Sequence, residues 1–148
     1  MLVSGEKKRA RVLLADDHPV VLEDLRTLVG SEFDVVAAVH DGNELVRAVE
    51  ALTPDVVVTD IAMPGLDGIA AAGKILRRSP TARIVFVSVH DELEMVQRGL
   101  ATGAYGYVVK GSAGYELLPA IDAALRGEYF LSELIKKHQI KIKSDQSE

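Results

Sequence analysis

The chain has 148 residues, of which 48% are hydrophobic and 26% charged, and a formal net charge of −5. This length fits one domain, and this balance excludes a disordered chain. Because Lys and Arg supply most of the affinity for nucleic-acid phosphates, the negative charge argues against strong nucleic-acid binding by this chain alone. The absence of cysteine excludes disulfides and thiol chemistry.

Strand-like and helix-like segments alternate along the chain. Short runs rich in Val, Ile, Leu and aromatic residues predict five strands, at residues 11–15, 33–39, 56–59, 83–88 and 105–109. Apolar residues recur at helical spacing after each run, and Pro19, Asn43 and Ser112 suit helix starts. Five βα units with short connections predict an α/β domain, with a parallel sheet covered by helices on both faces.

The predicted domain spans residues 10–127. The basic N-terminal extension, residues 1–9, precedes an apolar run that is too short for a secretion signal and ends in Asp16-Asp17. No segment approaches the roughly 20 apolar residues that a membrane span needs, so a cytoplasmic location is expected. We expect residues 128–148 to form a tail or the start of a linker, because they are too few for a second domain.

Carboxylates follow two strands that should be neighbours. Asp16 and Asp17 follow the first strand and Asp60 ends the third. In the flavodoxin-like strand order 2-1-3-4-5 these ends meet at the switch point of the sheet. Each like-charge pair about 4 Å apart costs on the order of 4 kcal/mol at an effective dielectric near 20. A divalent cation offsets that cost, and few carboxylates with a phosphate co-ligand favour Mg2+ over Ca2+.

The other two strand ends carry groups that bind phosphate. Ser88, which ends the fourth strand, offers a hydroxyl donor, and Lys110, which follows the fifth, offers a cation. Together with a carboxylate nucleophile at Asp60, these groups suit phosphoryl transfer. Each also has a simpler interpretation, since Asp16-Asp17 can cap a helix, Ser88 can end a strand and Lys110 can be solvated. Their joint placement at four strand ends favours the functional interpretation.

These motifs resemble the receiver domain of two-component response regulators. That family has a flavodoxin-like (βα)5 fold, a three-layer sandwich with a five-stranded parallel sheet in the order 2-1-3-4-5. The resemblance covers about residues 10–127. The matching strings are Leu13-Leu14-Ala15-Asp16-Asp17-His18, Val58-Thr59-Asp60-Ile61-Ala62-Met63-Pro64-Gly65-Leu66-Asp67-Gly68, Val87-Ser88-Val89 and Gly106-Tyr107-Val108-Val109-Lys110.

The resemblance implies an acceptor and a metal site. Asp60 would accept a phosphoryl group from a partner histidine kinase, or from a small phosphodonor, to give an aspartyl phosphate. Asp17 and Asp60 would hold Mg2+ through their carboxylates and Ala62 through its main-chain carbonyl. Asp16 would act through metal-bound water. On this resemblance the chain is a phosphoacceptor with autophosphorylation and autodephosphorylation activity, and not a classical enzyme.

The resemblance also implies a switch. Ser88 and Lys110 would bind the phosphoryl oxygens. Tyr107 would be the switch aromatic, which moves inward when Ser88 is drawn to the phosphate. From the residues alone, plain packing of an aromatic strand residue explains Tyr107 equally well.

Within the family, His18-Pro19 and the ending Arg126-Gly127-Glu128-Tyr129-Phe130-Leu131-Ser132 look most like the NarL (LuxR-type) subgroup. In that subgroup a helix-turn-helix DNA-binding domain follows the receiver. We therefore expect contact with DNA only through a separate output domain that this chain does not contain. Homodimerisation through the fourth and fifth βα units is a hypothesis from the same resemblance.

Three other functions fit less well. A haloacid-dehalogenase-like phosphatase carries an Asp-x-Asp motif after its first strand and usually a cap domain, whereas this chain has Asp16-Asp17-His18-Pro19 and no residues left for a cap. A flavin carrier on the same fold needs a hydroxyl- and Gly-rich phosphate loop where this chain has acids. A degenerate receiver, acting only as an interaction module, would not need the intact acceptor, hydroxyl and lysine.

Overall fold

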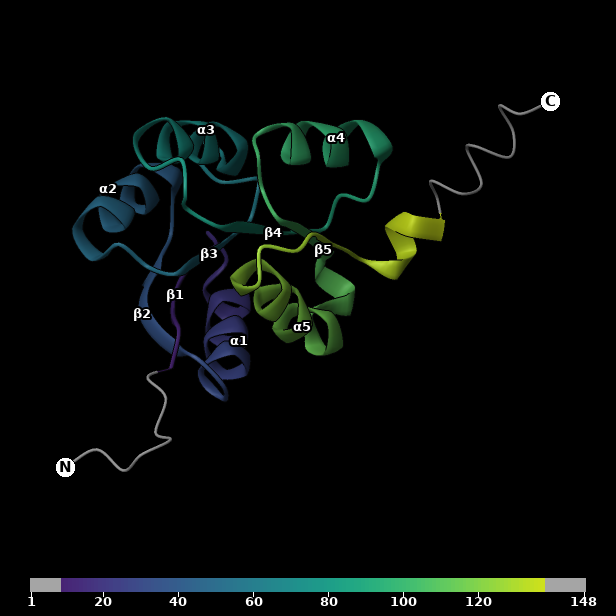
Figure 1. Cartoon of the computed structure of the whole chain (residues 1–148), viewed down its shortest axis with the longest axis horizontal. Coiled ribbons are helices and arrows are strands. Elements are labelled where there is room, and N and C mark those ends of the chain that lie inside the picture. Colours follow the sequence, from purple (N-terminus) through teal and green to yellow (C-terminus); the bar gives the residue numbers. More distant parts are fainter. Residues whose placement is uncertain (1–8, 138–148) are drawn as a thin grey trace.

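The computed structural model describes residues 9–137, which form one parallel sheet with helices on both faces (Figure 1). The strand order is β2-β1-β3-β4-β5-β6, and every neighbouring pair is parallel. The strands are β1 (Arg11–Ala15), β2 (Asp34–Val39), β3 (Val56–Thr59), β4 (Ile84–Ser88), β5 (Gly106–Val109) and β6 (Phe130–Leu131). The helices are α1 (Pro19–Gly30), α2 (Gly42–Leu52), α3 (Gly68–Arg78), α4 (Leu93–Ala101) and α5 (Ala113–Leu125), with a 3-10 turn η1 (Lys110–Ser112) before α5.

Two apolar layers hold the sandwich together. One contains buried residues of α1 and α5, and the other contains those of α2, α3 and α4, as the helices above and below the sheet in Figure 1 show. Successive strand residues alternate between the layers, so that Val12 and Leu14 face α1 and α5 while Leu13 and Ala15 face α2 and α3. Because both faces are buried, the central strands are apolar throughout, as a parallel sheet requires. The flavodoxin-like α/β prediction is confirmed.

The prediction of five strands was wrong in number, because β6 extends the sheet. The backbone N–H of Phe130 donates to the carbonyl of Tyr105 at 2.9 Å, and that of Ser132 donates to the carbonyl of Tyr107 at 3.0 Å. Residues 133–137 are helical, and Ile135 is only 1% exposed and packs in the same apolar layer as Tyr107. We refer to residues 130–135 as the C-terminal segment.

A buried carboxylate fixes the C-terminal segment to the domain. Glu116 Oε1 accepts a hydrogen bond from Ser132 Oγ at 2.5 Å, and Glu116 Oε2 accepts one from the Glu133 N–H at 3.0 Å. Ser132 Oγ in turn accepts from the Val109 N–H at 2.8 Å. Ser132 and Glu116 are both buried. This network ties α5, the end of β5 and the C-terminal segment into one unit.

Pro19 starts α1 as predicted, whereas Ser112, at the N-cap position of α5, makes no side-chain capping hydrogen bond. Asp67 caps α3, where its side chain accepts from the Ala70 N–H at 2.8 Å. Asn43 does not cap α2; Asp41 does, accepting from the Glu44 N–H at 2.8 Å. Glu44 Oε2 accepts from the His40 N–H at 2.8 Å, so its bond differs from that of a capping box by one residue.

The predicted N-terminal extension lies outside the described residues except for Arg9, and so does the predicted tail beyond residue 137. Within residues 9–137, every helix is too short or too polar to cross a membrane.

Candidate functional site

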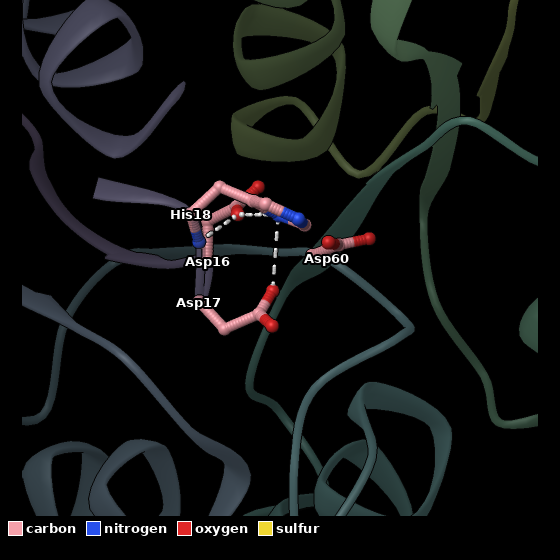
Figure 2. A group of neighbouring side chains, drawn as sticks. All are labelled: Asp16, Asp17, His18 and Asp60. Carbon is pink, nitrogen blue, oxygen red and sulfur yellow. Dashed lines mark hydrogen bonds and ion pairs between the residues drawn. The ribbon is translucent and has the colours of Figure 1, made fainter. Parts of the chain in front are cut away.

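The carboxyl ends of four adjacent strands meet at one edge of the sheet. Parallel pairing of β1 with β3, β3 with β4 and β4 with β5 brings Asp16, Asp60, Ser88 and Lys110 to this edge. Asp17 follows Asp16 directly. Ligand atoms of Asp16, Asp17, His18 and Asp60 lie within 4.8 Å of one another (Figure 2). The structure therefore brings together the predicted carboxylates and adds His18, which the sequence did not point to.

Lys110 bridges two of the carboxylates. Its Nζ lies 2.9 Å from Asp60 Oδ2 and 2.8 Å from Asp16 Oδ2. Burial lowers the pKa of Lys110, but the contacts with Asp16 and Asp60 outweigh this effect and raise the pKa above its ordinary value. Lys110 is therefore a fixed cation, and the interpretation of it as a freely solvated lysine is wrong.

Asp60 is a buried carboxylate whose pKa is raised above its ordinary value. It is 4% exposed, and this burial raises the pKa of Asp60, as does the charge of Asp16, while Lys110 and the Ile61 N–H oppose the rise. The Ile61 N–H donates to Asp60 Oδ1 at 2.7 Å. This bond leaves Oδ2, the oxygen beside Lys110, as the atom without a backbone donor.

Gly68 lets the chain after Asp60 fold back closely. A Cβ at this position would lie 2.0 Å from the carbonyl oxygen of Asp60, and the Gly68 N–H donates to the Ile61 carbonyl at 2.8 Å. Any side chain would push the start of α3 away from Asp60. The sequence predicts Gly68 only as part of a turn. Its close packing against Asp60 shows that it also sets the distance between Asp60 and the start of α3.

The donor set fits a hard divalent cation. Asp16 Oδ2 and Asp17 Oδ1 are buried and make no hydrogen bond within the described residues, although Asp16 Oδ2 has the ion pair with Lys110 and Asp17 Oδ1 lies 3.2 Å from His18 Nδ1. Unsatisfied buried carboxylate oxygens are costly, and a cation of the Mg2+ type prefers such ligands. The cluster of Asp16, Asp17 and Asp60 therefore has the oxygen donors that such a cation requires. That the Ala62 carbonyl and an Asp16-bound water take part stays a prediction.

Ser88 and Tyr107 lie on the adjacent strands β4 and β5. Ser88 is buried, and its Oγ accepts from the His90 N–H at 3.1 Å. Tyr107 is 0% exposed, and its hydroxyl donates to the His90 carbonyl at 2.8 Å. Burial raises the pKa of Tyr107, a rise that its contact with Ser88 opposes. In this structure Tyr107 is therefore in an inward position.

A glycine makes room for the inward ring. A Cβ on Gly99 of α4 would lie 3.2 Å from two ring carbons of Tyr107, Cδ2 and Cε2. The Tyr107 ring also packs against Phe86, with ring centroids 6.2 Å apart and planes tilted by 50°, and Phe86 Cδ2 would lie 3.3 Å from the same Cβ. Tyr107 thus occupies a site shaped by α4 and β4, a packing that the sequence alone did not predict.

Comparison with known proteins places this arrangement in a family. The response regulator receiver domain family matches residues 12–122. The uncharacterized transcriptional regulatory protein YxjL of Bacillus subtilis (strain 168) is 37% identical over 124 residues, which cover 82% of this chain and 57% of that protein. The nitrate/nitrite response regulator protein NarL of Escherichia coli (strain K12) is 35% identical over 133 residues, covering 88% and 62%. The chain thus spans about three fifths of the length of these relatives.

Solved structures agree with this placement. A two-component response regulator of the LuxR family from Aurantimonas sp. SI85-9A1 superposes with a TM-score of 0.87 at 36% identity, covering 95% of this chain and all of that one. The response regulator RcsB in its complex with DNA superposes with a TM-score of 0.81 at 28% identity, covering 88% of this chain and 67% of that one. The family is one of signalling receivers and not of classical enzymes. The chain belongs to the response regulator receiver domain family, in the NarL (LuxR-type) subgroup.

Proposed function

We propose that this receiver domain accepts a phosphoryl group on Asp60 and passes the signal on through Tyr107. The observation that supports this most is the position of Asp60, a buried carboxylate at a strand end, 2.9 Å from a lysine ammonium and within a cluster of two further acids. A buried lysine–carboxylate pair surrounded by extra acids is poorly suited to a purely structural role.

Phosphoryl transfer at this site requires few parts. An ionised Asp60 oxygen attacks the phosphorus, and the bond between phosphorus and the donor's nitrogen or oxygen breaks, so that the donor leaves with the electron pair. Lys110 favours the ionised form of Asp60 before attack and donates to a phosphoryl oxygen afterwards. When bound, Mg2+ would neutralise the added charge; Asp17 and Asp60, with the Ala62 carbonyl and an Asp16-bound water, would hold it.

The same reaction supplies the switch. A phosphoryl group adds about −1.5 to −2 charge and new acceptor oxygens. The Ser88 hydroxyl donates to one of these oxygens and shifts toward the phosphoryl group. Because Ser88 Oγ and the Tyr107 hydroxyl both bond the backbone of His90, this shift of Ser88 also changes the environment of Tyr107. Phosphorylation then favours the arrangement of α4 and β5 with Tyr107 inward.

The proposed partners follow from the relatives. The phosphodonor is a histidine kinase, in the cytoplasm, with small phosphodonors as substitutes that permit autophosphorylation. Two relatives are named as transcriptional regulators or nitrate response regulators, and RcsB is known in a complex with DNA. We propose that this domain likewise controls transcription through a separate DNA-binding output domain, with homodimerisation as a step in that control.

Intact mass after incubation with acetyl phosphate or phosphoramidate and Mg2+ tests the acceptor. We expect a labile gain of one phosphoryl group that Asp60→Asn abolishes. Asp55→Asn is the matched control, because Asp55 lies just before the opposite end of the same strand and bonds the Arg11 N–H; this variant should label like the wild type. Continued labelling of Asp60→Asn would contradict the proposal. Turnover of a phosphate ester would favour a phosphatase, and no labelling of the wild type would favour an interaction module.

A further inference from the structure

Ser132 lies where the C-terminal segment changes from strand to helix. Its N–H donates to the Tyr107 carbonyl at 3.0 Å, which continues the parallel ladder of β6 on β5. In such a ladder the Ser132 carbonyl would next accept from the Val109 N–H. It accepts instead from the N–H groups of Ile135 and Lys136, at 3.0 and 3.1 Å, and so begins a helical turn. The last ladder position on this side of β5 is therefore left to another acceptor.

The Ser132 hydroxyl is that acceptor. Its Oγ accepts from the Val109 N–H at 2.8 Å and donates its own proton to Glu116 Oε1 at 2.5 Å. Ser132 is 0% exposed and Glu116 is 6% exposed, so both groups are shielded from water. Glu116 Oε2 accepts from the Glu133 N–H at 3.0 Å. One buried carboxylate thus orients the hydroxyl and also holds the residue that follows it.

The bond to Ser132 fixes the backbone directly before Lys110. Val109 ends β5, and the turn η1 begins at Lys110. The Lys110 side chain is only 14% exposed, and its Nζ lies 2.8 Å from Asp16 Oδ2 and 2.9 Å from Asp60 Oδ2. A side chain held at both ends in this way depends on where its backbone starts. A shift of Val109 would therefore move the ammonium group relative to the two carboxylates.

The C-terminal segment is thus connected to the acceptor by a short chain of contacts. It runs from Glu116 to Ser132, to the Val109 N–H, to Lys110 and to Asp60. Under the proposed function, Lys110 donates to a phosphoryl oxygen once Asp60 is modified. Energetic coupling between two sites is reciprocal. A phosphoryl group that needs Lys110 in place must therefore favour the state in which Ser132 is bonded to Val109.

We propose that Ser132 is a positioning residue for Lys110, and that it couples the acceptor site to the C-terminal segment. A phosphoryl group on Asp60 favours the segment bound on β5, and release of the segment weakens the hold of the site on the phosphoryl group. The inference rests on the proposed function, because it takes Asp60 as the acceptor. It gives the signal a second route out of the site, along residues 130–135 and separate from α4.

Amide hydrogen exchange of the whole chain, followed by NMR, tests this coupling in the wild type. Exchange is measured in Mg2+ with and without beryllofluoride, which mimics a phosphoryl group on a carboxylate. We expect exchange at the Val109 and Glu133 N–H groups to slow by about fivefold or more, the lower end for coupled sites. The matched control is the Arg11 N–H, which is also bonded to a side chain, Asp55 Oδ2 at 2.7 Å, but at the opposite edge of the sheet. Its exchange should change by less than about twofold.

The affinity for beryllofluoride in Mg2+, read from the same spectra, gives the reciprocal measurement. Ser132→Ala should bind it about fivefold more weakly or worse. The control is Val49→Ala, which removes buried apolar atoms beside a cavity that Thr53 and Asp55 also line, at the opposite edge of the sheet. It should lose stability but bind as the wild type does. Circular dichroism shows whether both variants are folded, and the exchange measurement needs neither of them.

The inference is overturned if beryllofluoride leaves exchange at Val109 and Glu133 unchanged, or slows all three amides equally. It is also overturned if Ser132→Ala binds beryllofluoride as tightly as the wild type, or no more weakly than Val49→Ala. In these cases the wild type still binds beryllofluoride and is still labelled by acetyl phosphate, so the proposed function stands. A wild type that takes up neither reagent would refute the proposed function, and this inference with it.

Discussion

Replacement of Ser132 by Ala should destabilise the domain far more than the loss of one small polar group suggests. Ser132 Oγ accepts from the Val109 N–H at 2.8 Å and donates to Glu116 Oε1 at 2.5 Å. Both Ser132 and Glu116 are buried, so water cannot easily replace the lost partner. A hydrogen bond to a charged group is worth about 1.5–3 kcal/mol and a neutral one about 0.5–1.5 kcal/mol. The expected loss in the free energy of unfolding is therefore about 2–4 kcal/mol.

Urea unfolding followed by circular dichroism measures this loss, and thermal unfolding should show a fall in Tm of about 3 °C for each kcal/mol. Ser31→Ala is the matched control, because Ser31 is exposed and its hydroxyl donates to the Leu28 carbonyl at 2.7 Å. It should cost about 0.5 kcal/mol or less. A loss below about 1 kcal/mol in Ser132→Ala, or one equal to that in Ser31→Ala, would refute the reasoning.

A double-mutant cycle shows whether the cost comes from the carboxylate. In a Glu116→Leu background, Ser132→Ala no longer leaves a buried charge without a donor, so it should cost at least about 1 kcal/mol less than in the wild type. Equal costs in both backgrounds would mean that Ser132 acts only through Val109.

Three further changes probe the site itself. Tyr107→Phe removes the hydrogen bond to His90 and should lower the free energy of unfolding by about 1 kcal/mol. Because burial raises the pKa of Tyr107, the unfolded chain releases the phenol proton first, so the stability difference between wild type and variant should shrink by up to about 1.4 kcal/mol per pH unit above about pH 10. Urea titrations that show a constant difference would contradict this. Gly99→Ala crowds the Tyr107 ring and should lower the free energy of unfolding by about 1–3 kcal/mol. In a Tyr107→Leu background the same change should cost less. An equal cost would show that the added methyl group does not contact the Tyr107 ring. Asp60→Asn should raise Tm by about 3 °C in EDTA, because burial raises the pKa of Asp60 and the buried charge therefore destabilises the folded state. A lower Tm would mean that the ion pair with Lys110 stabilises the folded state by more than the burial of the charge destabilises it.

The strand ends were predictable from the sequence because burial on both faces gives parallel strands continuous apolar runs. Once the strand order was chosen, Asp16, Asp60, Ser88 and Lys110 had to reach one edge. Sheet topology thus converts positions far apart in the chain into neighbours, and the Lys110 contacts with two carboxylates follow from it.

Other features depend on contacts that no local pattern records. Strand β6 has two residues, and its place depends on Ser132 meeting Glu116, 16 positions earlier. The direction of the His18 ring depends on the turn before α1, and the placement of the Tyr107 ring depends on the space that Gly99 leaves. The cap at Asp41 is different, because an acid three residues before Glu44 is a local signal for a helix start, which Asn43 does not share.

The C-terminal segment also decides where this domain can be cut. A fragment ending at Gly127, the boundary that periodicity suggests, would leave the backbone groups of β5 that now pair with β6 open along the sheet edge. It would also remove Ile135 from the apolar layer that contains Tyr107. An open edge beside an exposed apolar layer is a template for pairing with another chain. A fragment carried through residue 137 keeps the β5 edge paired with β6.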